Sequence, residues 1–207
     1  IDSDDTTTIQ ATDLETSIQV TIPVPADVPG TVVVDARWLK QLLAKRNGST
    51  VLSRKANLVT VTIDEASFSI PGICPEDFPV LPDFTTDSPN TLLPANDFTR
   101  AARMTLSAVA PLDATRAILT GILMESYEAG DFGLTTTDGR RMHIVTFPAT
   151  STAPFAVIVP QEALKAFLDA VGKDQSGIRV ARIDGRISLA NDTVVVVGRD
   201  LSVDGDK

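Results

Sequence analysis

The amino-acid sequence predicts an α+β fold of repeated domains, in which antiparallel sheets are backed by a few helices. Many short stretches alternate apolar and polar residues, which is the pattern of half-buried strands. Only a few stretches place apolar residues at helical spacing. The chain also repeats itself after about 125 residues, an ordinary domain length. We therefore expect two copies of one unit in which sheet and helix pack together.

Short matching pieces define the repeat. Three of them occur twice, at an offset of 125 or 126 residues: Thr12-Asp13 with Thr137-Asp138, Leu39-Lys40 with Leu164-Lys165, and Gly72 with Gly198. The copies are unequal at their beginnings, because about 45 residues precede the second Thr-Asp pair from Thr91 onward and only 11 precede the first. We predict a first domain at 1–84, without its N-terminal strand and helix, and a second at 91–207. The polar residues from Thr85 to Asn90 form the linker.

Apolar spacing predicts three helices. The first carries one apolar stripe formed by Trp38, Leu39, Leu42 and Leu43. Its counterpart, from Gln161 to Val171, carries the stripe Ala163, Leu164, Phe167 and Leu168. A third helix is expected from Pro94 to Ala110, with a buried face of Phe98, Ala101, Ala102, Thr105 and Val109.

Period-two alternation predicts the strands. They include the segments around Ile18 to Ile22 and Val59 to Ile63, and then 122–125, 132–137, 142–146 and 194–197.

Composition narrows the possible settings. The formal net charge of −9 argues against simple electrostatic attraction to nucleic acid over the whole surface. No apolar run reaches the 18 residues of a membrane-spanning helix. The single cysteine, Cys74, cannot form an internal disulfide, which favours a reducing, cytoplasmic setting.

No enzyme motif stands out. The one histidine, His143, lies in an alternating run and is expected to be a half-buried or surface strand residue. With a single histidine and a single cysteine, a zinc site is not expected, and no cofactor motif is present. A small α+β hydrolase with paired carboxylates stays open as an alternative, although nothing in the sequence positions such a pair.

Five segments, taken in order, resemble one known family. They are Ala11 to Glu15, Pro75 to Leu81, Arg116 to Glu125, Thr137 to Arg141 and Val157 to Pro160. Together with the duplication, they resemble the bacterial sliding clamp, which is the β subunit of DNA polymerase III. The family has three similar domains per chain, and two chains close a ring around DNA. The resemblance covers the first domain from its middle onward and most of the second, with the third domain absent, as in a fragment or a shortened relative.

The resemblance implies a DNA-facing helix surface. The cations expected there are Arg37, Lys40, Lys45, Arg46, Arg100, Arg103, Lys165 and Lys173. Acidic residues would then fall on the outside, so that a chain of negative net charge could still enclose DNA and slide through water-mediated phosphate contacts.

The resemblance also implies a pocket for short hydrophobic peptides of the polymerase and the clamp loader. The residues matching it are Arg116, Leu119, Thr137, Gly139, Arg140, Arg141 and Met142. Arg140 replaces the usual histidine of the family and Met142 the usual leucine, and methionine should still pack.

The sequence therefore leads to a non-catalytic DNA clamp as the first hypothesis, which self-associates into a ring when intact. The second hypothesis is a clamp-derived fragment or paralogue that binds proteins without encircling DNA.

Overall fold

The computed structural model describes residues 6–44, 48–82, 91–127, 130–151, 154–174, 176–183 and 185–202. The chain divides into two compact units. The smaller unit comprises Ile1–Thr7 with Pro23–Val80, and the larger comprises Thr8–Ile22 with Leu81–Lys207. These units group residues by backbone contacts, so the domain boundaries 1–84 and 91–207 drawn from the repeat stay a prediction. The expected linker at 85–90 lies outside the described residues.

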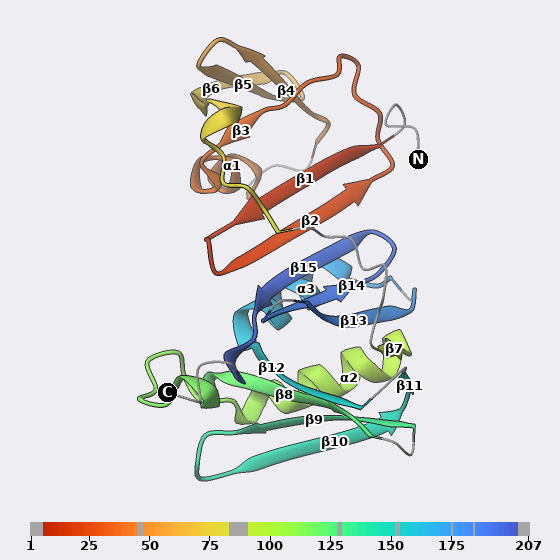
Figure 1. The fold of residues 1–207 in the computed structure, drawn as a ribbon. Helices are drawn as coiled ribbons and strands as arrows, with labels where there is room; N and C mark the ends of the chain where they lie inside the picture. The colour runs from red at the N-terminus through yellow and green to blue at the C-terminus, as the bar shows by residue number, and fades with distance from the viewer. Residues whose placement is uncertain are drawn as a thin grey trace. The chain divides into compact units, whose positions relative to one another are not determined.

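Two sheets form the larger unit (Figure 1). One has seven strands in the order β1-β2-β15-β14-β13-β7-β11, and the other has four in the order β10-β9-β8-β12. The strands are β1 Thr7–Thr12, β2 Thr16–Ile22, β7 Thr91–Leu93, β8 Gly121–Ser126, β9 Asp131–Thr137, β10 Met142–Pro148, β11 Thr150–Ser151, β12 Phe155–Pro160, β13 Ile178–Ile183, β14 Arg186–Ala190 and β15 Val194–Arg199. All of the predicted strand segments in this unit are confirmed.

Two α-helices pack against these sheets, α2 (Ala95–Thr105) and α3 (Gln161–Val171). The bounds predicted for α3 agree with the structure. The rings of Phe98 and Phe167 meet edge to face, with centroids 6.3 Å apart and an interplanar angle of 79°. Both side chains are fully buried in one core with Leu164, Ile122 and Val196, among others. Burial of each phenylalanine stabilises the fold by about 1.5–3 kcal/mol.

The third predicted helix is shorter than expected. It ends at Thr105 and is followed by a 3₁₀ turn, η2 (Leu106–Ala108), instead of continuing to Ala110. The Thr105 hydroxyl donates to the carbonyls of Ala101 and Ala102 at 3.0 and 3.1 Å. A side chain therefore supplies hydrogen bonds to backbone carbonyls in the last turn of the helix. The Ala110 amide donates instead to the Leu119 carbonyl at 3.1 Å, so the chain leaves the helix axis. Val109, expected on the helix, is therefore half-buried in extended backbone.

The smaller unit has one described sheet, in the order β3-β6-β5-β4, and one α-helix, α1 (Ala36–Leu43). Its strands are β3 Val33–Val34, β4 Thr50–Lys55, β5 Leu58–Ile63 and β6 Ala66–Ile73, followed by the 3₁₀ turn η1 Pro75–Asp77. The core consists of Val59, Val61, Ile63 and Ile70, and it is covered by Val32, Val34, Leu39 and Leu42. The strand predicted at 59–63 is confirmed.

The apolar stripe predicted for α1 is only half covered. Leu39 and Leu42 pack on the core, but Trp38 and Leu43 are 51% and 39% exposed. In α3, by contrast, all four residues of the matching stripe are buried, because α2 lies alongside. No second α-helix packs beside α1 within the described part of the smaller unit. The predicted helix and its apolar stripe are therefore present in this copy, but half of the stripe is open to solvent.

The turn between β9 and β10 is held by two side chains. The Thr137 hydroxyl donates to the Arg141 carbonyl at 2.8 Å and accepts the Gly139 amide at 3.0 Å. Asp138 Oδ1 accepts the amides of Arg140 and Arg141, each at 3.0 Å. Gly139 has a φ of +86°, in the left-handed region that glycine enters without steric cost.

The turn between β1 and β2 has the same geometry. The Thr12 hydroxyl donates to the Thr16 carbonyl at 2.9 Å and accepts the Leu14 amide at 3.0 Å. Asp13 Oδ1 accepts the amides of Glu15 and Thr16 at 3.0 and 2.7 Å. Leu14, at φ +78°, occupies the position that glycine fills in the second turn. The duplication seen in the sequence thus extends to individual hydrogen bonds.

Hydrogen bonds also govern the charge of the second turn. The backbone amides of Arg140 and Arg141, together with the Arg141 guanidinium, lower the pKa of Asp138 to about 2. Asp138 is therefore a carboxylate throughout the neutral and mildly acidic range.

The paired turns predict different changes in the free energy of unfolding for two substitutions in the same unit. Gly139→Ala should lower the free energy of unfolding by about 1–2 kcal/mol, because a side chain in left-handed backbone is strained even where the added Cβ meets nothing within 4 Å. Leu14→Gly should cause no loss, because relief of the same strain offsets the entropy of the new glycine. Urea denaturation followed by circular dichroism measures both. Equal losses in the two variants would contradict the shared geometry.

The lowered pKa of Asp138 predicts a pH-dependent stability. The folded carboxyl has the lower pKa, so its stabilising contribution is present above the ordinary value of 3.8 and is lost as pH falls toward about 2. Asp138→Asn should therefore lower the melting temperature at pH 6, and the difference from the unmodified chain should shrink between pH 4 and pH 2. Thermal melts across this range measure it, and a constant difference would rule out the carboxylate as the cause.

Candidate functional site

Cations lie on the exposed side of α2. The buried side of the helix consists of Ala95, Phe98, Ala101, Ala102 and Thr105. Arg100 and Arg103 are exposed and one turn apart, so they point to the same side. Arg100 Nη2 lies 3.3 Å from Asp97 Oδ1, and both side chains are largely open to solvent. This ion pair is screened and weak, which leaves Arg100 available to a stronger anion.

The exposed side of α3 has mixed charge. Lys165 is exposed and donates to Gln161 Oε1 at 2.7 Å. Glu162 and Asp169 are also exposed and share that side of the helix at helical spacing. Acidic side chains are therefore exposed on α3 as well as basic ones, and the expectation that acidic residues fall on the outside of a ring stays a prediction. Lys173, just past the helix end, is exposed.

The helix α1 carries two of the expected cations. Its exposed Arg37 pairs with Asp35, whose side chain also caps the helix by accepting the Arg37 amide at 2.9 Å. Lys40 is exposed on the next turn. The other two cations predicted for this region, Lys45 and Arg46, lie outside the described residues.

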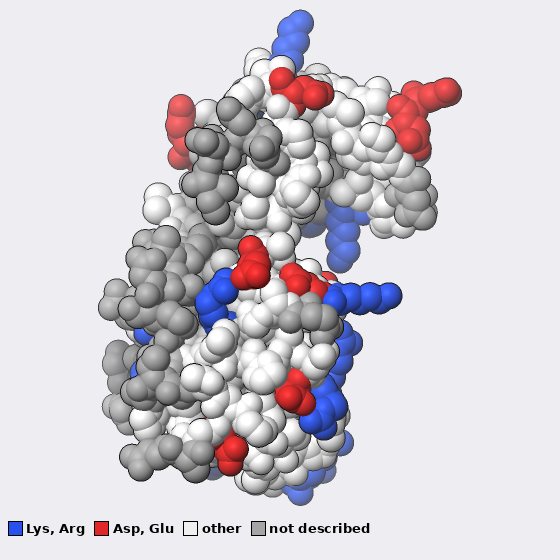
Figure 2. All heavy atoms as spheres, turned by 90° about the vertical axis from the view of Figure 1, so that its right-hand side faces the viewer, with Lys and Arg blue, Asp and Glu red and all other residues white. Residues whose placement is uncertain are grey.

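In the view of Figure 2, several Lys and Arg side chains of the larger unit lie along one edge, and some Asp and Glu side chains lie next to them.

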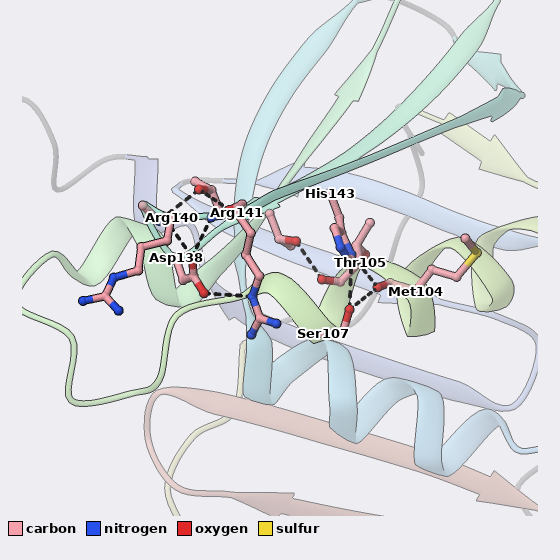
Figure 3. A network of polar contacts seen from close by, with 10 residues as sticks. Met104, Thr105, Ser107, Asp138, Arg140, Arg141 and His143 are labelled. Atoms are coloured by element: carbon pink, nitrogen blue, oxygen red, sulfur yellow. Dashed lines mark hydrogen bonds and ion pairs between the residues drawn. The ribbon is translucent and has the colours of Figure 1, made fainter.

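In the larger unit, the four-stranded sheet β10-β9-β8-β12 has one face turned toward α2. The Thr136 hydroxyl donates to the Thr105 carbonyl at 2.7 Å. His143 Nδ1 lies 3.1 Å from the Met104 carbonyl and 3.1 Å from the Ser107 hydroxyl (Figure 3). A carbonyl can only accept, so this geometry requires the proton on Nδ1. His143 is half-buried, as its alternating run predicted, and it ties β10 to the end of α2.

The opposite face of this sheet carries a row of side chains in which three are apolar and the fourth is a threonine. Ile144 lies opposite Thr135, Thr135 opposite Leu123, and Leu123 opposite Ile158, so the row crosses all four strands. Met142 lies opposite Thr137 at the strand ends and is 57% exposed, and Ile144 is 59% exposed. We call this surface the sheet patch: Leu123, Thr135, Thr137, Met142, Ile144 and Ile158.

The Arg116-to-Leu119 segment reaches the same end of the sheet. Arg116 precedes the 3₁₀ turn η3 (Ala117–Thr120), which leads directly into β8 at Gly121. The register of β8 with β9 brings the start of β8 beside Thr137. Leu119 is half-buried and Arg116 is exposed.

The arginines of the β9–β10 turn differ in their surroundings. Arg141 Nε lies 2.9 Å from Asp138 Oδ2, so this guanidinium is paired. The Arg140 side chain is exposed and points away from the network in Figure 3. Gly139 is exposed at the tip of the turn.

The sequence did not identify Leu123, Ile144 and Ile158 as members of this surface. A signal for Ile144 was present, because period-two alternation places it on the face of Met142. Leu123 and Ile158 become neighbours of the patch only through strand pairing, which the sequence alone does not specify.

Neither a metal-binding group nor a membrane-spanning helix is found among the described residues. Within the described ranges, no three His, Cys, Asp or Glu side chains form a group able to hold a metal ion. None of the described helices is long and apolar enough to cross a membrane.

Comparison with known proteins adds a similarity to one family. Residues 2–82 match the family model of the DNA polymerase III beta subunit, N-terminal domain. The chain is 27% identical over 179 residues to the Beta sliding clamp of Synechocystis sp., an alignment that covers 76% of this chain and 45% of that protein. The chain thus spans about half the length of the relatives it matches.

Solved structures share the fold. The DNA polymerase sliding clamp of Bacillus subtilis superposes with a TM-score of 0.80 at 20% identity, covering 95% of this chain and 54% of that one. The beta subunit from DNA polymerase of Streptococcus pyogenes gives a TM-score of 0.79 at 23% identity, covering 94% and 53%. A putative DNA polymerase III beta subunit from Eubacterium rectale gives 0.79 at 20%, covering 96% and 55%. Residues 2–82 are thus similar in sequence to a DNA polymerase III beta subunit domain, and nearly the whole chain shares its fold with solved sliding clamps.

Proposed function

We propose that this chain acts as a non-catalytic sliding clamp, which encloses duplex DNA and tethers a DNA polymerase to it. The observation that carries the proposal is the sequence relation to a β sliding clamp over 76% of the chain. Such a scaffold needs no reacting groups. It needs a cationic surface toward DNA, a docking surface for partners and edges that join into a ring. A role at the chromosome would also agree with the cytoplasmic setting inferred from the single cysteine.

The exposed cations of the helices support the DNA-facing role. Arg100 and Arg103 on α2, and Arg37 and Lys40 on α1, are all open to solvent. The acidic neighbours on α3 would keep the attraction weak, which suits a protein that must slide along DNA. Enclosure would then supply the persistence that affinity does not.

An open sheet edge supports self-association. β2 pairs with β15 along Thr16 to Val20. By the repeat, β10 is the counterpart of β2, and β10 is the last strand of its sheet among the described residues. An unpaired strand edge of this kind is a template for another strand, and it would join a further domain or a second chain when the ring is intact.

The sheet patch supports partner docking. Its exposed Met142 lies opposite Thr137 and directly follows Arg141, and all three are residues of the expected pocket. A short peptide from the polymerase or the clamp loader would bury part of this surface, gaining about 25 cal/mol for each Å² of apolar area.

A second candidate function is a protein-binding module that no longer encloses DNA. The mixed charge of α3 favours it, because Glu162 and Asp169 weaken a cationic wall. The two functions differ in whether duplex DNA is bound at all.

Substitution of the α2 arginines tests the DNA-facing role. Arg100→Ala with Arg103→Ala should weaken binding to a fluorescent DNA duplex several-fold at low salt and reduce the dependence of log affinity on log salt by roughly one to two. Stability should change by less than about 0.5 kcal/mol, because both side chains are exposed.

Lys55→Ala is the matched control for this measurement, because Lys55 is an exposed cation on β4 rather than on a helix. Unchanged DNA affinity in the double arginine variant would contradict the DNA-facing role of α2. No binding of duplex DNA by the unmodified chain would favour the protein-binding module.

Substitution within the docking surface tests the second role. Met142→Asp and Leu119→Asp should each abolish binding of a labelled peptide with two large apolar anchors, because a carboxylate would replace the apolar contact. Met142 is the cleaner site, since it is more exposed and less involved in packing. Fluorescence anisotropy measures binding, and circular dichroism checks the fold.

Met104→Asp provides the comparison, since this methionine is 52% exposed on α2 and lies outside the patch. If a folded Met142→Asp protein binds the peptide as tightly as the unmodified chain, the patch is not the docking surface.

A further inference from the structure

The only histidine of the chain is bound to the end of α2. The proton on His143 Nδ1 is shared between the Met104 carbonyl and the Ser107 hydroxyl oxygen, each 3.1 Å away. Ser107 Oγ in turn donates to the same Met104 carbonyl at 2.9 Å. The ring is thus held through Nδ1 (Figure 3), and Nε2 makes no hydrogen bond with the described residues. Nε2 can therefore take up a second proton without breaking these contacts.

These contacts bring His143 to the exposed side of α2. Ser107 follows Arg103 and Arg100 at the spacing of one helix face, and its bond to the Met104 carbonyl continues the helical turn into η2. Ser107, Arg103 and Arg100 are all exposed. His143 comes from β10, but it therefore borders the same surface as the two arginines.

The carboxylates of the surrounding elements are paired or far along the strand. The elements next to His143 are α2, η2, β9 and the β9–β10 turn, and their charged residues are Asp97, Arg100, Arg103, Asp131, Asp138, Arg140 and Arg141. Asp97 pairs with Arg100, and Asp138 pairs with Arg141. Asp131 lies opposite Pro148 at the far end of the hairpin, whereas His143 lies opposite Thr136. A proton on Nε2 would therefore add to the positive charge of the α2 arginines.

We propose that His143 is a further DNA-binding residue, whose protonated ring contacts a phosphate beside Arg100 and Arg103. The inference rests on the proposed enclosure of duplex DNA and adds a residue to its DNA-facing surface. Histidine ordinarily changes its charge between about pH 5 and pH 8. A phosphate next to the ring favours the charged form, so protonation and DNA binding strengthen each other. The affinity for duplex DNA should therefore rise as pH falls through this range.

Titrations of a fluorescent DNA duplex with the whole chain, at about pH 5.5 and about pH 7.5, test the proposal. The duplex should bind about three- to fivefold more tightly at the lower pH. The slope of log affinity against log salt should also be steeper there by about 0.9, which is the change for one additional phosphate contact. Calorimetry in two buffers of different ionisation enthalpy should show that protons are taken up when DNA binds.

Two variants assign the effect to one position. His143→Asn keeps a donor for the Met104 carbonyl but has no titratable charge, so it should bind DNA with the same affinity and salt slope at both pH values. Thr146→His in the His143→Asn background is the matched control, because Thr146 is exposed on the opposite face of the same strand. This second variant should not restore the pH dependence. Circular dichroism at both pH values checks that each protein is folded.

The outcomes separate two failures. If the unmodified chain binds DNA equally well at both pH values and takes up no proton, His143 does not contact the phosphates, and the proposed DNA-facing role of the arginines stands. The same conclusion follows if folded His143→Asn keeps the pH dependence or if Thr146→His restores it. If the unmodified chain binds no duplex at either pH, the proposed enclosure of DNA fails and the role of His143 fails with it.

Discussion

The edge-to-face contact between Phe98 and Phe167 holds the functional geometry of the larger unit together. It joins α2 to α3 in a core that both sheets share. Because each helix buries the side that meets this core, its opposite side must face solvent. The position of Arg100, Arg103 and Lys165 on exposed surface follows from which residues the core removes from water. The exposure of these cations therefore requires only that they lie on the helix faces that do not pack against the core.

The smaller unit illustrates what happens where that packing is incomplete. Its helix has the same apolar spacing as α3, yet Trp38 and Leu43 remain exposed. The exposed Trp38 borders a groove that is also lined by Leu42, Phe68 and Ile70. In the larger unit, the corresponding stripe is covered by a second helix. An apolar helix face therefore becomes a core only when another element lies against it.

The two repeated turns share one backbone geometry but present different side chains. Both use a threonine hydroxyl and an aspartate carboxylate to hold the same hydrogen bonds. The residue with left-handed backbone is Leu14 in the β1–β2 turn and Gly139 in the β9–β10 turn. The turn itself is thus a structural device present in both copies. What distinguishes the second copy is the pair of arginines after Gly139, placed beside an exposed apolar sheet face.

Much of the fold could be predicted from the amino-acid order. Local periodicity predicted the strands, the helix Gln161–Val171 and the placement of His143 and Met142 on opposite faces of one strand, because these depend on neighbours within a few residues. The duplication likewise predicted that the two Thr-Asp turns would match. The early end of α2 and the exposure of Trp38 were not predictable, since hydrogen bonds to distant carbonyls and the neighbouring helix decide them.

The site divides in the same way. Amino-acid order by itself determined which arginines and apolar residues are candidates, and it placed Thr137 to Met142 on one turn. Only the tertiary structure decided that Leu123 and Ile158 join Ile144 in one row, because strand pairing brings them together from separate segments. It also decided that Arg141 is neutralised while Arg140 is not. That difference depends on where one carboxylate points, and side-chain direction is set by packing and hydrogen bonding rather than by position in the chain.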